Sequence, residues 1–389
     1  MIRLLHVADL HPDNAGTFAG KTVVNPETGL NQSLVDLRSS LNYGYDVATD
    51  PSTRCDLAVI PGDLFDSPRP HMNEVRIIRD FVHRLALEMP VFVIDGNHDL
   101  SQNPNDAPAT ICLEGLGNVF VEHRPRTQRI VVRGQECAVS FLPYPTKGHL
   151  LTRMDTAGDS PEAITAKINH ALADILRGLK ASADPTQPHI LLAHGSVANA
   201  KVGEQPRAIA HDILIPLDEL EGFDYVALGH IHAHQQVAPN AWYSGSLMRQ
   251  SFGEEREEKG FCIVGIEDGQ SKVAFCRNPH ARTYRTIDHD SFVPGATLDP
   301  TVIYRYKAAL TEEQYRVRKP DIDLLADRLP YFQQDIQIVK EDRARDAGMA
   351  EMPTLEEAIK RIFGTRVTDD ELARLLEENA RLQTEVSRV

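Results

Sequence analysis

Five short apolar segments, each followed directly by polar residues of the kind that bind metal ions, constrain this chain more than any other feature. The segments are rich in Val, Ile and Leu and end at a turn, which is typical of buried strands. The clusters that follow them are Asp9-Leu10-His11, Gly62-Asp63-Leu64-Phe65-Asp66, Gly96-Asn97-His98-Asp99, His194-Gly195 and His230-Ile231-His232. An Asx turn or a helix cap would explain one cluster, but not the recurrence of His, Asp and Asn at every predicted strand end.

Helical patterns lie between these predicted strands. Residues 73–87 place apolar side chains along one stripe, and Ser160 is a good N-cap for a second helix that begins with Pro161. Strands that alternate with helices predict a layered α/β domain, in which ligands gather at the carboxyl ends of the strands. We therefore expect all five clusters to line one crevice.

Composition limits the class of protein. A length of 389 residues predicts two or three domains, and five scattered cysteines without a Cys-x-x-Cys pair favour reduced thiols in a cytoplasmic protein. No segment approaches the ~20 apolar residues of a membrane span, and the N-terminus lacks the apolar stretch of a signal peptide. The net charge of −15 argues against nonspecific nucleic-acid binding by the whole surface. It leaves open a local binding face, or a site whose positive charge comes from metal ions.

The clusters offer carboxylate, imidazole and amide oxygen ligands without thiolate, a set that suits manganese, iron or zinc. They contain more ligands than one ion needs. A carboxylate shared between two ions ~3.5–4 Å apart is the usual arrangement for in-line displacement at a phosphoester. The sequence therefore predicts a two-metal site, with three solvated loop histidines at residues 230, 232 and 234 as the alternative.

In their order and spacing, the five motifs resemble those of the calcineurin-like metallophosphoesterase superfamily over residues 9–232. The resemblance implies a layered αββα sandwich that binds two divalent ions, with manganese expected. It implies one ion held by Asp9, His11 and His232, a second held by Asn97, His194 and His230, and Asp63 as the bridge. It also implies that His98 is a catalytic acid oriented by Asp66. His234 matches no ligand position and is expected at the rim, while Asp99 is expected to shape its loop.

The segment YSGSLMRQSFGEEREEKGF at residues 243–261 resembles the region after the last metal motif in SbcD-type exonuclease subunits. That resemblance implies a nuclease in DNA repair and recombination, acting as an exonuclease on duplex ends and an endonuclease on single strands. The alternative is an ordinary loop and edge strand, since Ser and Gly favour turns.

The organisation expected from these patterns is a phosphoesterase domain at residues 1–285, a small α+β capping domain at 286–342 and a helical tail at 343–389. In the second, strands at 301–310 and 331–341 flank a helix at 321–329. SbcD-type subunits carry a DNA-capping domain at this place, so the resemblance implies a DNA-capping role. Arg316, Arg318 and Lys319, expected between strand and helix, would contact phosphates or form a solvated charge run.

The tail begins two helices with capping boxes, Thr354 to Glu357 and Thr368 to Glu371. In the last helix, apolar residues and one Asn alternate at spacings of three and four, which predicts a coiled-coil seam. The seam residues are Leu372, Leu375, Asn379, Leu382, Val386 and Val389. A helix folded back on its own domain is the alternative. The SbcD resemblance implies that the seam binds the coiled coil of an SMC-like ATPase of the SbcC type, in a nucleoid-associated complex containing a homodimer of this chain.

Two rival functions remain at this point. One is a stand-alone phosphodiesterase that acts on small phosphoesters, and the other is a non-catalytic scaffold with the same fold. The complete ligand set argues against the scaffold, and the C-terminal seam argues against the stand-alone enzyme.

Overall fold

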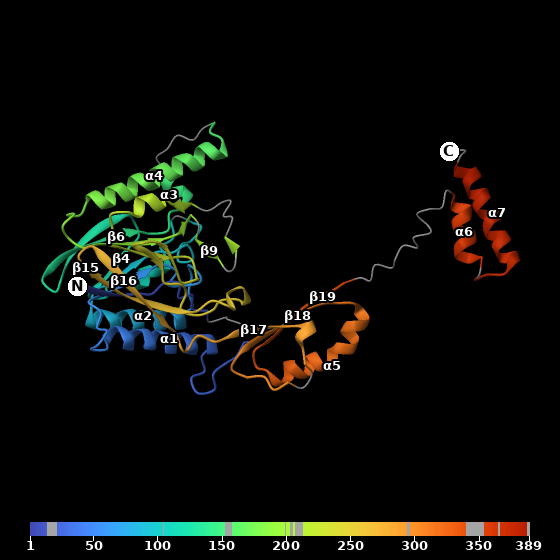
Figure 1. Cartoon of the computed structure of the whole chain (residues 1–389), viewed down its shortest axis with the longest axis horizontal. Helices are drawn as coiled ribbons and strands as arrows, with labels where there is room; N and C mark the ends of the chain where they lie inside the picture. The colour runs from blue at the N-terminus through green and yellow to red at the C-terminus, as the bar shows by residue number, and fades with distance from the viewer. Residues whose placement is uncertain are drawn as a thin grey trace. The chain divides into compact units, whose positions relative to one another are not determined.

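The computed structural model describes residues 1–13, 22–103, 105–151, 158–198, 200–202, 205–206, 213–293, 296–339, 354–364 and 366–386. The chain divides into two compact units, and Figure 1 labels its main helices and strands. The first contains residues 1–308 and 320–336, and the second contains residues 309–319 and 337–389. The domain boundaries expected at residues 285 and 342 stay predictions.

Two six-stranded sheets form the centre of the first unit. One sheet has the order β16-β15-β1-β2-β3-β4, in which β1 to β4 are parallel and β15 and β16 are antiparallel additions at one edge. Its strands are β1 Ile2–His6, β2 Leu57–Pro61, β3 Val91–Ile94, β4 Val119–Glu122, β15 Gly260–Glu267 and β16 Gln270–Arg277.

The second sheet has the order β13-β14-β12-β7-β6-β5, with parallel strands in the middle and an antiparallel strand at each edge. Its strands are β5 Arg126–Val132, β6 Gln135–Leu142, β7 His189–His194, β12 Tyr225–Gly229, β13 Gln235–Ala238 and β14 Ala241–Tyr243. Short two-residue strands, β8 Ser196–Val197, β9 Lys201–Val202, β10 Gln205–Pro206 and β11 Leu214–Ile215, form two small ladders beside it.

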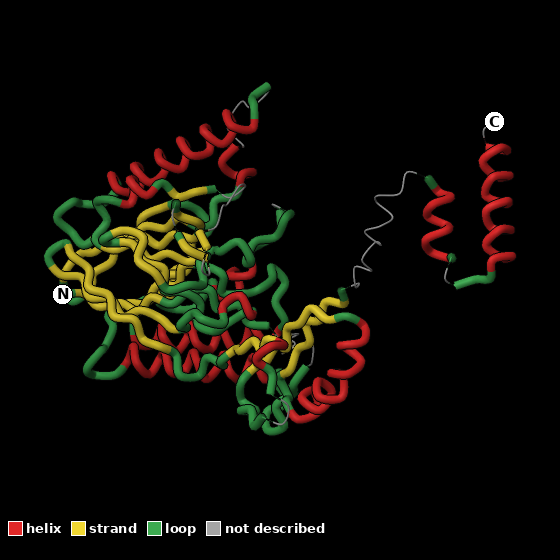
Figure 2. The backbone as a smooth tube through the Cα atoms, turned by 45° about the vertical axis from the view of Figure 1, so that its right-hand side comes forward, coloured by secondary structure: helices red, strands yellow, loops and turns green. Residues whose placement is uncertain are grey.

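Helices cover the outer face of each sheet, which gives four layers (Figure 2). Helices α1 Gln32–Thr49 and α2 Met72–Glu88 pack on the first sheet, and α4 Pro161–Ala181 packs on the second, preceded by the short α3 Lys147–Leu151. Between the sheets, Val59 and Phe92 from one meet Phe141 and Leu192 from the other in a third apolar core. The expected αββα sandwich is confirmed.

The predicted helix starts are confirmed in α4, where Ser160 Oγ accepts a hydrogen bond from Ala163 N at 3.3 Å. Helix α1 was not expected from the sequence. Its apolar residues are interrupted by Ser40 and Gly44, so its periodicity is weak, although Leu34, Leu37 and Leu41 are fully buried against the sheet. Packing on the sheet, rather than local pattern, stabilises this helix.

A three-stranded sheet follows, with β17 Tyr284–Asp288, β18 Ile303–Leu310 and β19 Phe332–Ile338 in that order. Helix α5 Glu312–Arg328 connects the last two strands. The expected helix start at residue 321 is wrong, because Thr311 and Gln314 form a capping pair in which Thr311 N donates to Gln314 Oε1 at 2.9 Å. Arg316, Arg318 and Lys319 therefore lie within α5 and not in a connecting loop.

The tail forms a helical hairpin of α6 Leu355–Phe363 and α7 Asp369–Val386, which pack against each other. Both expected capping boxes contribute hydrogen bonds, from Glu357 N to Thr354 Oγ1 at 3.3 Å and from Thr368 N to Glu371 Oε2 at 2.9 Å. Leu375 and Leu382 are 41% and 52% exposed. The side chain of Val386 and all of Val389 lie outside the described residues. Among the described helices, none has the length and apolar character needed to cross a membrane.

Candidate metal centre

The five predicted clusters follow β1, β2, β3, β7 and β12, at the carboxyl ends of neighbouring parallel strands in the two sheets. Because these ends point the same way, residues far apart in the chain meet there. Among the described residues, side chains come together in three groups whose ligand atoms lie within 4.8 Å of one another. The groups are Asp9, His11 and His232; Asp63, His194 and His230; and His11, Asp66 and His98.

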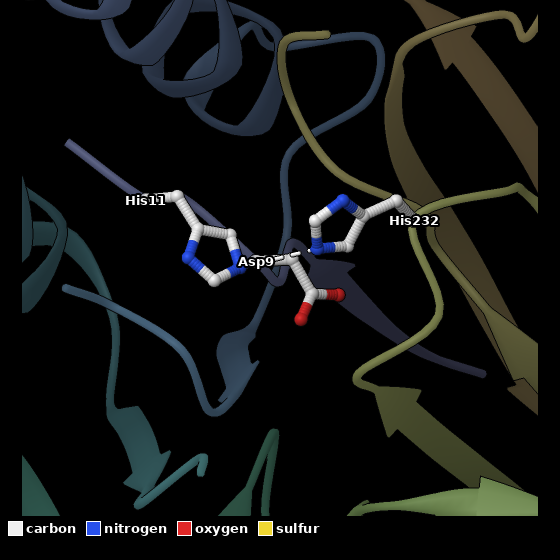
Figure 3. Close-up of side chains that lie close together, drawn as sticks. All are labelled: Asp9, His11 and His232. Carbon is white, nitrogen blue, oxygen red and sulfur yellow. Dashed lines mark hydrogen bonds between the residues drawn. The ribbon is translucent and has the colours of Figure 1, made fainter. Parts of the chain in front are cut away.

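In the first group, the imidazoles of His11 and His232 flank Asp9 (Figure 3). Their Nε2 atoms are 3.1 Å apart. Asp9 Oδ1 accepts a hydrogen bond from His230 N at 2.8 Å, whereas Asp9 Oδ2 is buried and has no hydrogen-bond donor among the described residues. A buried carboxylate oxygen facing two imidazole nitrogens is a good fit for a divalent cation.

The second group gathers around Asn97. Its Oδ1 lies 3.0 Å from His194 Nε2 and 2.8 Å from His230 Nδ1. Asp63 joins this group to the first, because Asp63 Oδ2 is 3.4 Å from His194 Nε2 and 3.5 Å from His11 Nε2. A single carboxylate therefore lies between two sets of nitrogen and oxygen ligands, in the position of a bridge.

The backbone at these loops is strained. Asp9, His11, Asp63 and His230 all have positive φ values, of 53°, 38°, 51° and 100°. Non-glycine residues seldom adopt this region, and it persists only where surrounding contacts impose it. Leu10 N donates to Asp63 O at 2.9 Å, which ties the first two loops together.

Two glycines make this close packing possible. Gly62 has φ 88°, and a Cβ at Gly62 would collide with the ring of His194. A Cβ at Gly96 would overlap the carboxylate of Asp63. The sequence motifs therefore place glycine where the ligand side chains come closest to the neighbouring backbone.

Hydrogen bonds at Nδ1 determine which ring nitrogen faces the centre. His194 Nδ1 lies 2.8 Å from Pro61 O, and His232 Nδ1 lies 2.8 Å from Glu254 Oε1. A carbonyl or carboxylate oxygen can only accept, so each Nδ1 carries a proton and each Nε2 is the ring nitrogen left to face the centre. Such partners commonly fix the tautomer of a metal-binding histidine.

The charges in the centre shift one another's pKa values. Burial disfavours the ionised form of Asp63, but the positive charges of His194 and His11 outweigh burial and lower the pKa of its carboxyl. Burial likewise opposes protonation of His194, yet Asp63 and Asp9 raise the pKa of its ring to about 9. Protons neutralise the cluster when no cation does so. A cation bound at this cluster would therefore displace protons.

His98 and Asp66 lie at the edge of the centre. His98 N donates to Asp63 Oδ1 at 2.8 Å, and its 43% exposed side chain has Nδ1 3.1 Å from the backbone oxygen of Asp66. The Asp66 carboxylate is 3.6 Å from His98 Nδ1 and 3.3 Å from His11 Nδ1. Asp66 therefore contacts His98 more closely through its carbonyl than through its side chain.

His234 lies away from the rim where the sequence placed it. Its ring stacks on Phe275 and Trp242, with centroids 4.2 and 5.5 Å away, and Nδ1 lies 3.0 Å from Tyr243 O. Aromatic packing therefore holds this ring. Asp99, by contrast, shapes its loop as expected, accepting from Gly96 N at 2.8 Å and Phe65 N at 3.0 Å.

Glu254 is the residue of the centre that the sequence analysis missed. It lies in a 3₁₀ turn, η3 Phe252–Glu254, and lines a cavity of about 450 Å³ together with His98 and His232. Burial opposes ionisation of Glu254, but His232 and Lys259 outweigh it and lower the pKa of the carboxyl to about 2. Both Glu254 and Lys259 lie in the segment at residues 243–261. That segment indicated a family, but it assigned no role to either residue.

A family model described as calcineurin-like phosphoesterase matches residues 2–234. This chain belongs to the calcineurin-like phosphoesterase family. Members of the family are metal-dependent hydrolases that use divalent metal ions, and the His and Asp groups described above could hold such ions. The family resemblance expected from the five motifs is thus confirmed.

Among curated relatives, the chain is 26% identical over 226 residues to the SbcD subunit of the nuclease SbcCD from Staphylococcus epidermidis. The match covers 55% of this chain and 56% of that protein, so the chain spans little more than half the length of this relative. The expected similarity to SbcD is confirmed over this part of the chain. Among solved structures, sulfate thiohydrolase SoxB of Thermus thermophilus, in complex with glycerol, is similar with 13% identity and a TM-score of 0.35. It covers 71% of this chain and 56% of that chain, and the likeness adds nothing to the assignment.

Proposed function

We propose that this protein is a two-metal DNA phosphodiesterase, the nuclease subunit of an SbcC–SbcD-like complex that processes DNA ends in repair and recombination. It would act as an exonuclease on duplex ends and as an endonuclease on single strands. The observation that carries the two-metal proposal is the position of Asp63 Oδ2, 3.5 Å from His11 and 3.4 Å from His194. A carboxylate between two ligand groups is the arrangement that a dinuclear centre requires.

In this proposal the ligands divide between two ions. Asp9, His11 and His232 would hold the first ion, Asn97, His194 and His230 would hold the second, and Asp63 would contribute to both sites. The donors are oxygen and nitrogen atoms without thiolate, and we propose manganese as the ion in both positions. Two such ions would supply positive charge that neutralises the phosphodiester as its bond to the leaving oxygen breaks.

His98 would handle the proton of the leaving group. Because Nδ1 donates to the carbonyl of Asp66, Nε2 is the ring atom available to give a proton to the leaving oxygen. Asp66 would position this ring through its backbone. The side chain of His98 is accessible, as a group that meets a bound substrate must be.

DNA is proposed as the substrate because of the relative and of the sheet β17-β18-β19 beside the cavity. Thr286 of β17 donates to Glu255 from N and Oγ1, at 3.1 and 2.7 Å. The guanidinium of Arg305, in β18, lies 4.6 Å above the ring of Phe252. The first contact reaches Glu255, directly after η3, and the second reaches Phe252 within η3. Gly253 and Glu254 of the same turn line the cavity, and a capping domain at residues 286–342 would there guide a strand into the centre.

The α6–α7 hairpin would bind the partner ATPase. Leu375 and Leu382 leave apolar surface exposed on α7, while Leu372 and Asn379 are half-buried. An SMC-like ATPase of the SbcC type, with this chain as a homodimer in a cytoplasmic, nucleoid-associated complex, completes the proposal. Val386 would extend the same seam.

Manganese-dependent digestion of linear DNA, measured beside hydrolysis of bis-p-nitrophenyl phosphate, tests the proposal. We expect both substrates to be cleaved, and neither in the presence of a chelator. Turnover of the small ester alone would favour a stand-alone phosphodiesterase, and turnover of neither by the manganese-loaded protein would favour a non-catalytic scaffold.

A further inference from the structure

We infer that Glu254 is a positioning residue for the first metal site: it fixes the ring of His232 and strengthens that ligand through its negative charge. The inference rests on the proposed two-metal function and assigns a role that the family motifs leave open. Glu254 is separated from His232 by 22 residues and reaches it from a different turn.

The contact between the two side chains is direct. Glu254 Oε1 lies 2.8 Å from His232 Nδ1, and only 13% of the Glu254 side chain is exposed. With Nδ1 donating to this carboxylate, Nε2 is the ring nitrogen of His232 that faces His11 and Asp9. A carboxylate behind an imidazole raises the basicity of the ring and fixes its orientation.

A fully buried lysine holds Glu254 in place. Lys259 Nζ lies 2.8 Å from Glu254 Oε2 and 2.7 Å from Glu257 Oε2, and it donates to Ser246 Oγ at 2.9 Å. It also donates to His232 O at 3.1 Å. The side chain of His232, Glu254, Lys259 and the backbone of His232 thus form a closed ring of contacts that leaves the imidazole little freedom.

The turn that carries Glu254 is itself fixed. Gln250 N donates to Glu254 Oε2 at 3.0 Å, and Arg249 Nε donates to Glu254 O at 3.2 Å. The carboxylate therefore arrives at His232 already oriented, which is what a positioning residue needs.

In the second site, the described oxygen behind the ring of His194 carries no charge. There His194 Nδ1 is held by the neutral carbonyl of Pro61 at 2.8 Å. A change at Glu254 should therefore affect one metal site and spare the other.

The experiment compares Glu254→Gln with Glu257→Gln in the full chain. Both residues have side chains 13% exposed and both contact Lys259, but only Glu254 contacts His232. Calorimetric titration with Mn²⁺ should show two ions per wild-type chain. We expect Glu254→Gln to weaken one of the two sites by roughly 10–100-fold and Glu257→Gln to weaken neither.

A double-mutant cycle tests whether Glu254 changes Mn²⁺ affinity through His232. If Glu254 acts through His232, then adding Glu254→Gln to His232→Ala should cause no further loss of Mn²⁺ affinity. Equal weakening in Glu254→Gln and Glu257→Gln would overturn the inference, because the effect would then run through Lys259. Wild-type Mn²⁺ affinity in Glu254→Gln would overturn the inference about Glu254 and leave the proposed function standing. A wild-type chain that binds no Mn²⁺ would overturn both.

Discussion

The metal centre and the α6–α7 hairpin are held together over very different distances along the chain. At the centre, His232 meets His11 across 221 residues, and the loops that carry the ligands adopt strained backbone conformations. In the hairpin, each helix is started by a capping residue three positions from its partner, and its apolar residues recur every three or four positions. The centre has buried polar atoms facing inward, while the hairpin has apolar atoms facing outward.

The two regions are therefore stabilised in different ways. The centre brings together charges that are costly to bury, so it depends on cations or protons to balance them. The hairpin forms from local signals, and its exposed leucines favour contact with another surface. Changes at the centre should therefore affect metal binding and chemistry, and changes in the hairpin should affect association.

The largest effect is expected from Asp63→Ala. Removing the carboxylate between the two ligand groups should empty both metal sites and abolish cleavage, because each ion loses a shared charged ligand. Metal content after gel filtration and phosphodiester hydrolysis measure the two losses. Two ions retained by this variant would show that Asp63 does not bridge.

His98→Ala should separate chemistry from metal binding. It removes a proton donor and no proposed ligand, so both ions should remain while kcat falls by roughly 10²–10⁴-fold. Metal content and single-turnover cleavage of the same preparation test this. A His98→Ala protein found empty of metal would contradict the division of roles at the centre.

Deleting residues 368–389 should leave the centre intact and remove association. Mn²⁺-dependent cleavage of single-stranded DNA should continue at the wild-type rate, while ATP-stimulated processing of duplex ends with the candidate ATPase should be lost. Cosedimentation of the two proteins at micromolar concentration is the direct measurement. Wild-type association without these residues would mean that α7 serves only local packing against α6.

Asn379→Leu is the finer probe of the same helix. If Asn379 faces a partner helix, an apolar replacement should tighten association and loosen register, giving mixed oligomers. If it faces only α6, the change should alter thermal stability and leave the distribution of oligomers as it was. Sedimentation velocity distinguishes these outcomes.

The smallest effect concerns His123, which supports the loop before Asn97. Its Nδ1 lies 2.8 Å from the buried carboxylate of Asp95, and this hydrogen bond, opposed by burial, raises the pKa of His123 to about 9 from 6.5. Because the folded value is the higher one, the stabilisation is fully present below pH 6.5 and is lost as the pH rises through about 9. This contact should add about 1–2 kcal/mol to the free energy of unfolding, allowing for the partial exposure of His123.

Unfolding of wild type and His123→Gln between pH 6 and pH 10 measures this contribution. The difference in free energy of unfolding between the two should shrink as the pH rises. His83→Gln, which changes an exposed histidine on α2, provides the matched control. A difference that does not change with pH would mean that charge on His123 contributes nothing.

The sequence by itself predicted the features that depend on neighbours along the chain. Apolar runs ending in polar clusters identified the strands and their functional ends, and Ser160 and Thr368 marked helix starts through contacts three residues away. The groups that contain Asp9, Asp63 and His230 were expected together because parallel strands that alternate with helices end at the same edge of a sheet.

The tertiary structure decided the rest. Helix α1 exists because a sheet covers its buried face, and His234 lies between Trp242 and Phe275 although its spacing matches that of His230 and His232. The role of Glu254 depends on a turn and a buried lysine that come after His232 in the chain. Periodicity reports which way a side chain points, but only packing between distant segments determines what it meets there.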